Sequence, residues 1–389
     1  MSEIKVNSIK GVGASVAAIS IDNANGSCTA NITNNLSNRN LIINGAMQVA
    51  QRGTSFSAVQ NTFTLDRFKF KRESTAANFT MSQSTISPDG FSKSLKVDCT
   101  AADNSTAHNE FVMVRYNIEA QDLQHLGYGT SAAKPLVLSF YVRSSLTGTY
   151  GVNLLQIDNS NKIYSRTYTI NSADTWERKT ISIPADTSGV INHDNGVGLQ
   201  INFSLVIGSS YKGSAVSSAW ETYTNSNFAS QHGVNFASST SNDLYLTGVQ
   251  LEVDQNGSGV ATDFEHRSFA QELALCQRYF QQIGAVGQDG TYGIAPGYLY
   301  NSGNNVAFGY IMPVMMRTSP TITNGSTYLQ IETGSMQTDI NSYNFVETIF
   351  PSTFISISGV LHTDSGNNNQ IVVVTNGPTN GLATLSAEL

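Results

Sequence analysis

Between Asn40 and about Val253, apolar residues alternate with polar residues at a period of two. This alternation predicts strands, because successive side chains of a strand point to opposite faces and only one face is buried. The runs are short and are separated by Gly, Asn, Asp, Ser and Thr, which favour turns. The residues predicted to face inward are Phe68 and Phe70; Leu95, Val97 and Cys99; Val112, Val114, Tyr116 and Ile118; Leu136, Leu138, Phe140 and Val142; Ile181 and Ile183; Leu199, Ile201, Phe203 and Leu205; and Leu244 and Leu246.

About seven or eight such strands follow one another with no helical segment between them, which excludes βαβ units. The chain is therefore predicted to be mainly β, with an antiparallel β-sandwich of the jelly-roll type. Its 389 residues, 40% of them hydrophobic, are enough for more than one core. We predict a terminal segment at 1–40, the sandwich at 41–265, a connecting helix at 266–284 and a second small β domain at 285–389.

The strongest helix pattern covers residues 269–283. Ser268 and Gln271 have the spacing of a capping box, and Gly284 stands where a left-handed C-terminal cap is expected. The apolar positions are spaced 4, 3, 4, 3, as in the a and d positions of a coiled coil. Two hypotheses remain open, a helix that packs on a neighbouring sheet and a helix for self-association. The seam consists of Phe269, Leu273, Cys276, Phe280 and Ile283.

Residues 285–389 return to the β pattern, with Gly-rich turns and prolines that suit strand edges. Four tyrosines in Gly-rich or Asn-rich contexts are candidates for contact with a ligand, because an aromatic ring offers an apolar face and a polar tip. Inward-facing strand tyrosines are the alternative. The four candidates are Tyr292, Tyr298, Tyr300 and Tyr343.

The charge balance narrows the range of partners. Lys plus Arg number 21 and Asp plus Glu 28, so the net charge is -7, and charged residues make up only 13% of the chain. A neutral to acidic surface disfavours nucleic-acid binding. The Ala/Ser/Gly-rich run at 11–21 is too short and too polar for a membrane span or an export signal. Three scattered cysteines without a CxxC pair indicate free thiols in a reducing cytosol.

Motifs for catalysis and metal binding are absent from the sequence. It contains no GxSxG, HExxH or GxxxxGK[ST], so no catalytic residue, metal site or cofactor is predicted. Paired carboxylates are the remaining enzymatic hypothesis, with Asp263, Glu265 and Glu272 as the local candidates. All three flank the predicted start of the helix, where carboxylates stabilise the helix dipole.

Several stretches taken together resemble the tail-fibre and related virion proteins of bacteriophages, especially phages of marine bacteria and cyanobacteria. The resemblance covers about residues 40–284, and residues 285–389 match less well. It rests on Asn40–Gly45, Gln48, Gln51–Thr54, Asp66 and Arg67, Leu138–Ser144, Thr175–Pro184, Gly248–Val253, Phe264–Arg267 and Glu272–Tyr279.

This resemblance implies a jelly roll like that of carbohydrate-binding modules, with Trp176 as a core anchor. It implies a homotrimer, and a virion location after synthesis in the host cytoplasm. Residues 1–40 would dock to other virion proteins, although a loose terminus is the alternative. The expected function is attachment to a host surface polysaccharide through the distal β domain, without membrane insertion. The alternatives are a purely structural virion component, such as a fibre adaptor or a decoration protein, and a glycan-degrading enzyme.

Overall fold

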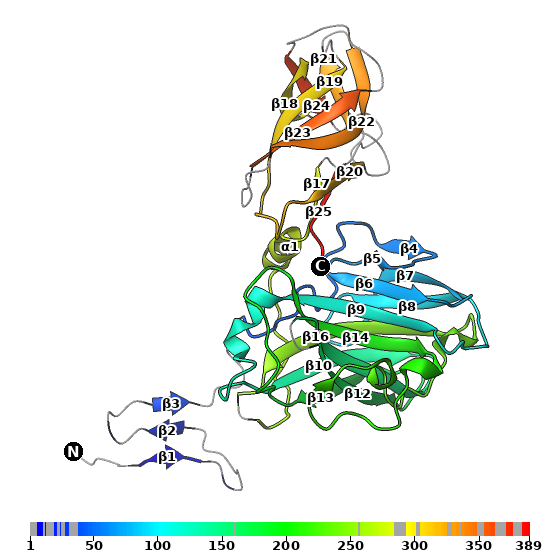
Figure 1. The fold of residues 1–389 in the computed structure, drawn as a ribbon, viewed down its shortest axis with the longest axis vertical. Coiled ribbons are helices and arrows are strands. Elements are labelled where there is room, and N and C mark those ends of the chain that lie inside the picture. Colours follow the sequence, from blue (N-terminus) through cyan, green and yellow to red (C-terminus); the bar gives the residue numbers. More distant parts are fainter. Residues whose placement is uncertain are drawn as a thin grey trace.

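The computed structural model describes residues 6–10, 12, 19–21, 24, 28–30, 38–158, 161–255, 257–283, 293–300, 304–324, 329–333, 336–347, 354–361, 371–375 and 383–389. Near the N-terminus three short strands form an antiparallel sheet in the order β1-β2-β3 (Figure 1). These strands are β1 (Ser8–Ile9), β2 (Ile19–Ile21) and β3 (Cys28–Ala30).

The central unit is an antiparallel sandwich, as the alternation predicts. One sheet has six strands in the order β13-β10-β16-β8-β7-β4, and the other has seven in the order β15-β12-β11-β14-β9-β6-β5. The first sheet contains β13 (Glu177–Ile183), β10 (Leu136–Ser144), β16 (Asp243–Val253), β8 (Ser94–Ala101), β7 (Asn78–Ser84) and β4 (Ser55–Ser57). The second contains β15 (Glu221–Thr222), β12 (Lys162–Ile170), β11 (Gly148–Gln156), β14 (Val197–Ile207), β9 (Phe111–Glu119), β6 (Phe68–Glu73) and β5 (Thr62–Phe63).

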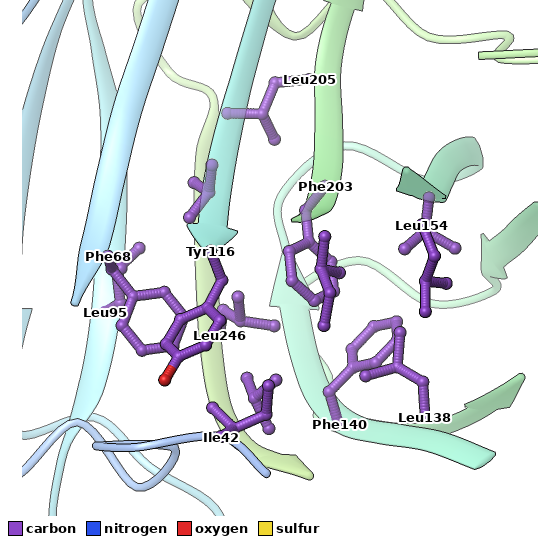
Figure 2. Packing of buried hydrophobic residues seen from close by; sticks show 14 of the residues in the cluster. Ile42, Phe68, Leu95, Tyr116, Leu138, Phe140, Leu154, Phe203, Leu205 and Leu246 are labelled. Carbon is purple, nitrogen blue, oxygen red and sulfur yellow. The ribbon is translucent and has the colours of Figure 1, made fainter. Parts of the chain in front are cut away.

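The sandwich core lies between the two sheets. Every residue predicted to face inward from the alternation belongs to this core, and each is at most 7% exposed. Figure 2 shows side chains of both sheets meeting there, with Phe68, Tyr116 and Phe203 on one sheet and Leu95 and Phe140 on the other. Aromatic rings pack edge to face at its centre, with 5.1 Å between the ring centroids of Phe140 and Phe203.

Trp176 is not the core anchor that the resemblance implies. It is half-buried and contacts Tyr245 at the surface of the six-stranded sheet. The buried tryptophan is Trp220, whose indole Nε1 donates a hydrogen bond to the Pro184 carbonyl oxygen at 2.8 Å. Trp220 lies in the segment before β15, outside the alternating runs, so the strand pattern gave no indication of its burial.

A second, smaller core lies on the outer face of the seven-stranded sheet. There the segment 208–238 folds back over the sheet and buries Met113, Leu155 and Ile163 against Phe228. The segment includes the short 3-10 helices η2 (Ser209–Tyr211), η3 (Asn225–Asn227) and η4 (Phe236–Ser238), and η1 (Ala120–Leu126) follows β9. As a result, nearly all of β14 is buried on both faces.

The C-terminal domain is a closed barrel with the strand order β18-β19-β23-β22-β21-β24 (Figure 1). Its interior is apolar, and Leu299, Val306, Ile331 and Ile357 are fully buried in it. This agrees with the predicted second small β domain. Its strands are β18 (Gly293–Tyr300), β19 (Asn305–Ile311), β21 (Gln330–Thr333), β22 (Met336–Glu347), β23 (Phe354–Leu361) and β24 (Ile371–Thr375).

The barrel is joined to the sandwich by two passes of the chain. Helix α1 (Phe269–Gln277) leads into β17 (Phe280–Ile283), which pairs with β25 (Ala383–Ser386), and β25 pairs in turn with β20 (Thr321–Asn324). Strand β25 carries the chain back from the barrel, so the last residues lie beside the sandwich (Figure 1). Residues 383–389 therefore belong to the junction.

Candidate functional site

Tyr298 and Tyr300 lie together on the outside of the barrel. They alternate along β18 with Leu299, which is fully buried in the barrel interior. Tyr298 is 52% exposed, Tyr300 is half-buried, and their ring centroids are 6.0 Å apart at an interplanar angle of 45°. The structure therefore brings two of the four predicted tyrosines into one exposed aromatic pair.

The side chains of the other two candidate tyrosines lie outside the described part of the structure. Tyr343 lies on β22, where its backbone is opposite Gly359 of β23. Tyr292 lies outside the described residues. A ligand role for either residue remains a prediction.

An exposed apolar stripe continues from Tyr298 across the neighbouring strand β24. Tyr298 is directly opposite Ile371, and Pro296 is directly opposite Val373. Ile371 is 80% exposed and Val373 is 47% exposed. The four adjacent strands β24, β18, β19 and β23 contain no charged residue. These four strands therefore present an aromatic and apolar surface, of which the sequence indicated only the tyrosines. The next strand, β21, borders it with Glu332, whose backbone is directly opposite Val373.

The predicted self-association seam is interrupted. Helix α1 ends at Gln277, so Phe280 and Ile283 lie on strand β17, where both are buried inside the chain. Cys276 is also buried, Leu273 is half-buried and Phe269 is 55% exposed. The spacing of 4, 3, 4, 3 is interrupted because the apolar residues after Gln277 pair with β25 instead of continuing the helix. The continuous helix over 269–283 and the cap at Gly284 were therefore wrong.

The start of α1 agrees with the prediction. Ser268 is the N-cap, and its side chain and that of Gln271 form the reciprocal capping box. The Ser268 hydroxyl oxygen accepts the Gln271 backbone N–H at 3.3 Å, and Gln271 Oε1 accepts the Ser268 backbone N–H at 3.0 Å. The capping box thus gives hydrogen-bond partners to two backbone N–H groups that a helix N-terminus otherwise leaves unpaired.

The carboxylates near the helix start have structural partners. Glu265 Oε2 accepts the Asn40 backbone N–H at 2.7 Å, and Glu272 Oε1 accepts the Asn44 backbone N–H at 2.6 Å. Arg267 lies between them, within 3.8 Å of Glu265 and 3.5 Å of Glu272. The two glutamates thus anchor the segment Asn40–Asn44, which favours a structural interpretation over a catalytic pair.

A network of buried charges occupies the junction between sandwich and barrel. Glu119 at the end of β9 accepts hydrogen bonds from Arg278 Nη2 at 2.6 Å and from the Tyr279 hydroxyl at 2.9 Å. The Arg67 guanidinium lies 3.4 Å from the centroid of the Tyr279 ring and pairs with Glu388 at 2.6 Å. No local sequence pattern indicates this network, because its members come from distant parts of the chain.

A pocket of about 480 Å³ opens where the edges of the two sheets meet, between β12 and β13. Tyr164, Arg166, Ser182 and Asp254 are among its lining residues. Several of its polar groups have partners within the chain: the Tyr164 hydroxyl donates to the Ser182 carbonyl oxygen at 3.1 Å, and Asp254 Oδ2 accepts the Gly259 N–H at 2.6 Å. Tyr164 and Asp254 therefore stabilise the fold at this pocket.

In the part of the chain that the structure describes, no cluster of His, Cys, Asp and Glu could hold a metal ion. Cys99 and Cys276 are free and buried, as predicted for core thiols. Within the same residues, none of the helices is long and apolar enough to cross a membrane.

Comparison with known proteins identifies no family. No family model and no curated protein matches the chain. Among solved structures, the enzymatically active domain of bacteriophage CBA120 tailspike protein 4 is 12% identical over 51% of this chain, with a TM-score of 0.28. That similarity spans 21% of the tailspike chain.

Two sugar-binding proteins are similar to about the same extent. A putative sugar binding protein from Bacteroides thetaiotaomicron is 11% identical over 56% of this chain and 100% of that one, with a TM-score of 0.31. A family 11 carbohydrate-binding module from Clostridium thermocellum, in complex with a mixed-linked tetrasaccharide, is 10% identical over 55% of this chain and 99% of that one, with a TM-score of 0.26.

Proposed function

We propose that the protein is a bacteriophage virion fibre protein that attaches the particle to a host surface glycan through the barrel. The observation that carries this proposal is the exposed pair of Tyr298 and Tyr300, which lies among four strands that contain no charged residue. The faces of neutral sugars are apolar and their edges are polar, so they suit an aromatic ring with a hydroxyl at its tip. Charged side chains would instead hold water at the surface and oppose the contact.

The position of the barrel supports this role. It projects from the sandwich through the two-pass junction, while the N-terminal strands belong to the other end of the chain (Figure 1). We expect residues 1–40 to dock to other virion proteins and several copies, as in a homotrimer, to present their barrels together. Linking several weak sites raises overall binding by about 10² to 10⁴ without new contacts.

A structural virion component that binds only other phage proteins is the second candidate. The exposed side chains of Ile371 and Val373 favour it, because exposed β-branched residues beside an aromatic pair are also typical of protein interfaces. In that case the stripe would be covered by another virion protein, and the barrel would bind no sugar.

A glycan microarray probed with the labelled full-length chain tests the proposal. We expect one class of neutral glycan to be bound, and Tyr298→Ala combined with Tyr300→Ala to weaken that binding about tenfold or more. Ile311→Ser is the matched control, because Ile311 is an exposed barrel residue outside the tyrosine pair. Wild-type protein that binds no glycan, or a control that loses as much binding as the tyrosine variant, contradicts the proposal.

We also expect binding without turnover. Incubation of the full-length protein with each bound glycan should release no new reducing ends. Their appearance would favour the glycan-degrading alternative, and a screen of Asp and Glu variants would then locate the catalytic pair.

A further inference from the structure

Three cationic side chains lie next to one another on the outer face of the seven-stranded sheet. Lys69 on β6 is directly opposite Arg115 on β9, and Lys71 is two residues further along the same face of β6. All three are half-buried. We refer to Lys69, Lys71 and Arg115 as the basic face.

In the described part of the chain, no carboxylate is in direct contact with the basic face. None of its three residues makes an ion pair among the described residues. Arg115 bonds only neutral groups there: Nε donates to Asn202 Oδ1 at 2.7 Å, and Nη2 lies 3.6 Å from Met113 Sδ.

Two carboxylates act on the basic face from a greater distance. Glu73, at the exposed end of β6, attracts Lys71. Glu388 attracts Lys69, but its own oxygens are paired with Arg52 at 2.9 Å and Arg67 at 2.6 Å. The basic face therefore keeps an excess of positive charge in a chain whose net charge is -7.

The three charges are held together at an electrostatic cost. Burial lowers the pKa of Arg115 to about 10. Burial and the charge of Arg115 lower the pKa of both lysines, and Lys69 further lowers the pKa of Lys71. An anion placed among the three would relieve this repulsion and replace the water that burial has removed.

Aromatic rings border the basic face. Lys69 Nζ lies 4.9 Å from the ring centroid of Phe63, and Lys71 Nζ lies 5.7 Å from that of Phe111. Tyr211, from the segment that folds over the sheet, packs edge to face on Phe111 at 5.5 Å. Half-buried rings beside unpaired cations combine an apolar platform with groups that bind acids.

We propose that the basic face is a second binding site, for an acidic polysaccharide. Its carboxylate or sulfate groups pair with the three cations, and its sugar rings lie against Phe111 and Tyr211. This site belongs to the sandwich and does not depend on the tyrosine pair of the barrel. A nucleic acid fits less well, because the cations span only two strands and the rest of the chain repels a long polyanion.

Affinity electrophoresis of the full-length protein in gels containing alginate, dextran sulfate or neutral dextran tests this proposal. We expect alginate or dextran sulfate to retard the migration of the protein. Neutral dextran should not bind to the basic face. Lys69→Gln combined with Lys71→Gln should weaken the binding about tenfold. Lys69→Arg combined with Lys71→Arg should retain it.

The control is Lys93→Gln combined with Lys134→Gln, which removes the same charge from elsewhere on the sandwich. The proposal is overturned if neither acidic polymer retards the wild-type protein, if the control weakens binding equally, or if single-stranded DNA binds more tightly than both polymers. The variant with Ala at positions 298 and 300 should bind the acidic polymers normally. A negative result for the basic face is thus distinguishable from a negative result for glycan binding at the barrel tyrosines.

Discussion

Arg67 Nη1 lies 2.6 Å from Oε2 of Glu388, so the residue directly before β6 is paired with a residue that follows β25. Arg67 is only 1% exposed, and its Nη2 also donates to the Asn117 carbonyl oxygen at 2.7 Å. Although burial disfavours the charged form, the Glu388 carboxylate raises the pKa of Arg67. The ion pair stabilises the junction, because it connects the residues after β25 to the sandwich.

Loss of the Glu388 carboxylate should destabilise the junction strongly. Glu388→Gln leaves the buried Arg67 charge without its partner, and we expect the free energy of unfolding to fall by about 3 kcal/mol. Chemical denaturation followed by tryptophan fluorescence measures this. Asp174→Asn is the control, because Asp174 is 57% exposed and a surface ion pair such as Arg143–Asp174 is worth less than about 1 kcal/mol. Equal losses in the two variants would contradict the proposed role of the junction pair.

His232 should make stability fall in mild acid. Its Nδ1 accepts the Gly151 N–H at 3.0 Å and its Nε2 lies 2.9 Å from the Val234 carbonyl oxygen, so the neutral ring fits the site. Burial and the nearby Lys212 charge lower the pKa of His232 to about 4. Between about pH 6.5 and pH 4 the unfolded chain binds a proton that the folded chain does not, so folding stability decreases as the pH falls through this window.

The measurement is the difference in unfolding free energy between the wild type and His232→Gln at several pH values. That difference should narrow by up to about 3 kcal/mol from pH 6.5 to pH 4, because the variant lacks the proton-binding group. A difference that is constant with pH would show that His232 does not titrate in this window.

Gly45 should tolerate no side chain. A Cβ at this position would overlap the Val249 carbonyl oxygen of β16, and Val249 donates its N–H to the Gly45 carbonyl oxygen at 3.0 Å. We expect Gly45→Ala to lower the free energy of unfolding by about 2 kcal/mol or to prevent folding. Gly233→Ala is the control, because the nearest atom to its Cβ would be at 3.7 Å. Similar stability of the two variants would refute the close packing at Gly45.

Strand alternation predicted the sandwich core because period-two burial is a local property of the sequence. Alternation was less informative for β14, because the segment 208–238 covers the outer face of the sheet and the outward-facing Asn202 is fully buried. The Asn202 amide donates hydrogen bonds to Asn153 Oδ1 at 2.8 Å and Gln200 Oε1 at 3.3 Å. The helical spacing of 269–283 misled after Gln277, because Phe280–Ile283 pair with β25 instead of continuing the helix. Contacts such as Arg67 with Glu388 depend on tertiary folding and have no local signature.

The candidate sites also divide into features with a local sequence signal and features that depend on tertiary folding. Tyr298 was selected because its Gly-rich context is typical of an exposed loop, whereas the structure places it on β18, where its exposure follows from strand alternation. The basic face could not be found in this way, because Lys69 and Arg115 become neighbours only through the β6–β9 register. The stripe formed by Tyr298 and Ile371 likewise requires the closing of the barrel.

Adsorption of the fluorescently labelled full-length protein to a panel of candidate host bacteria tests the central claim most directly. Point variants are preferable to truncation after residue 284, because truncation would also remove β25 and the Glu388 carboxylate from the junction. We predict that the wild type and Ile311→Ser stain one host, and that the variant with Ala at positions 298 and 300 does not. Equal staining by all three proteins, or no staining of any host, would contradict attachment through the barrel tyrosines.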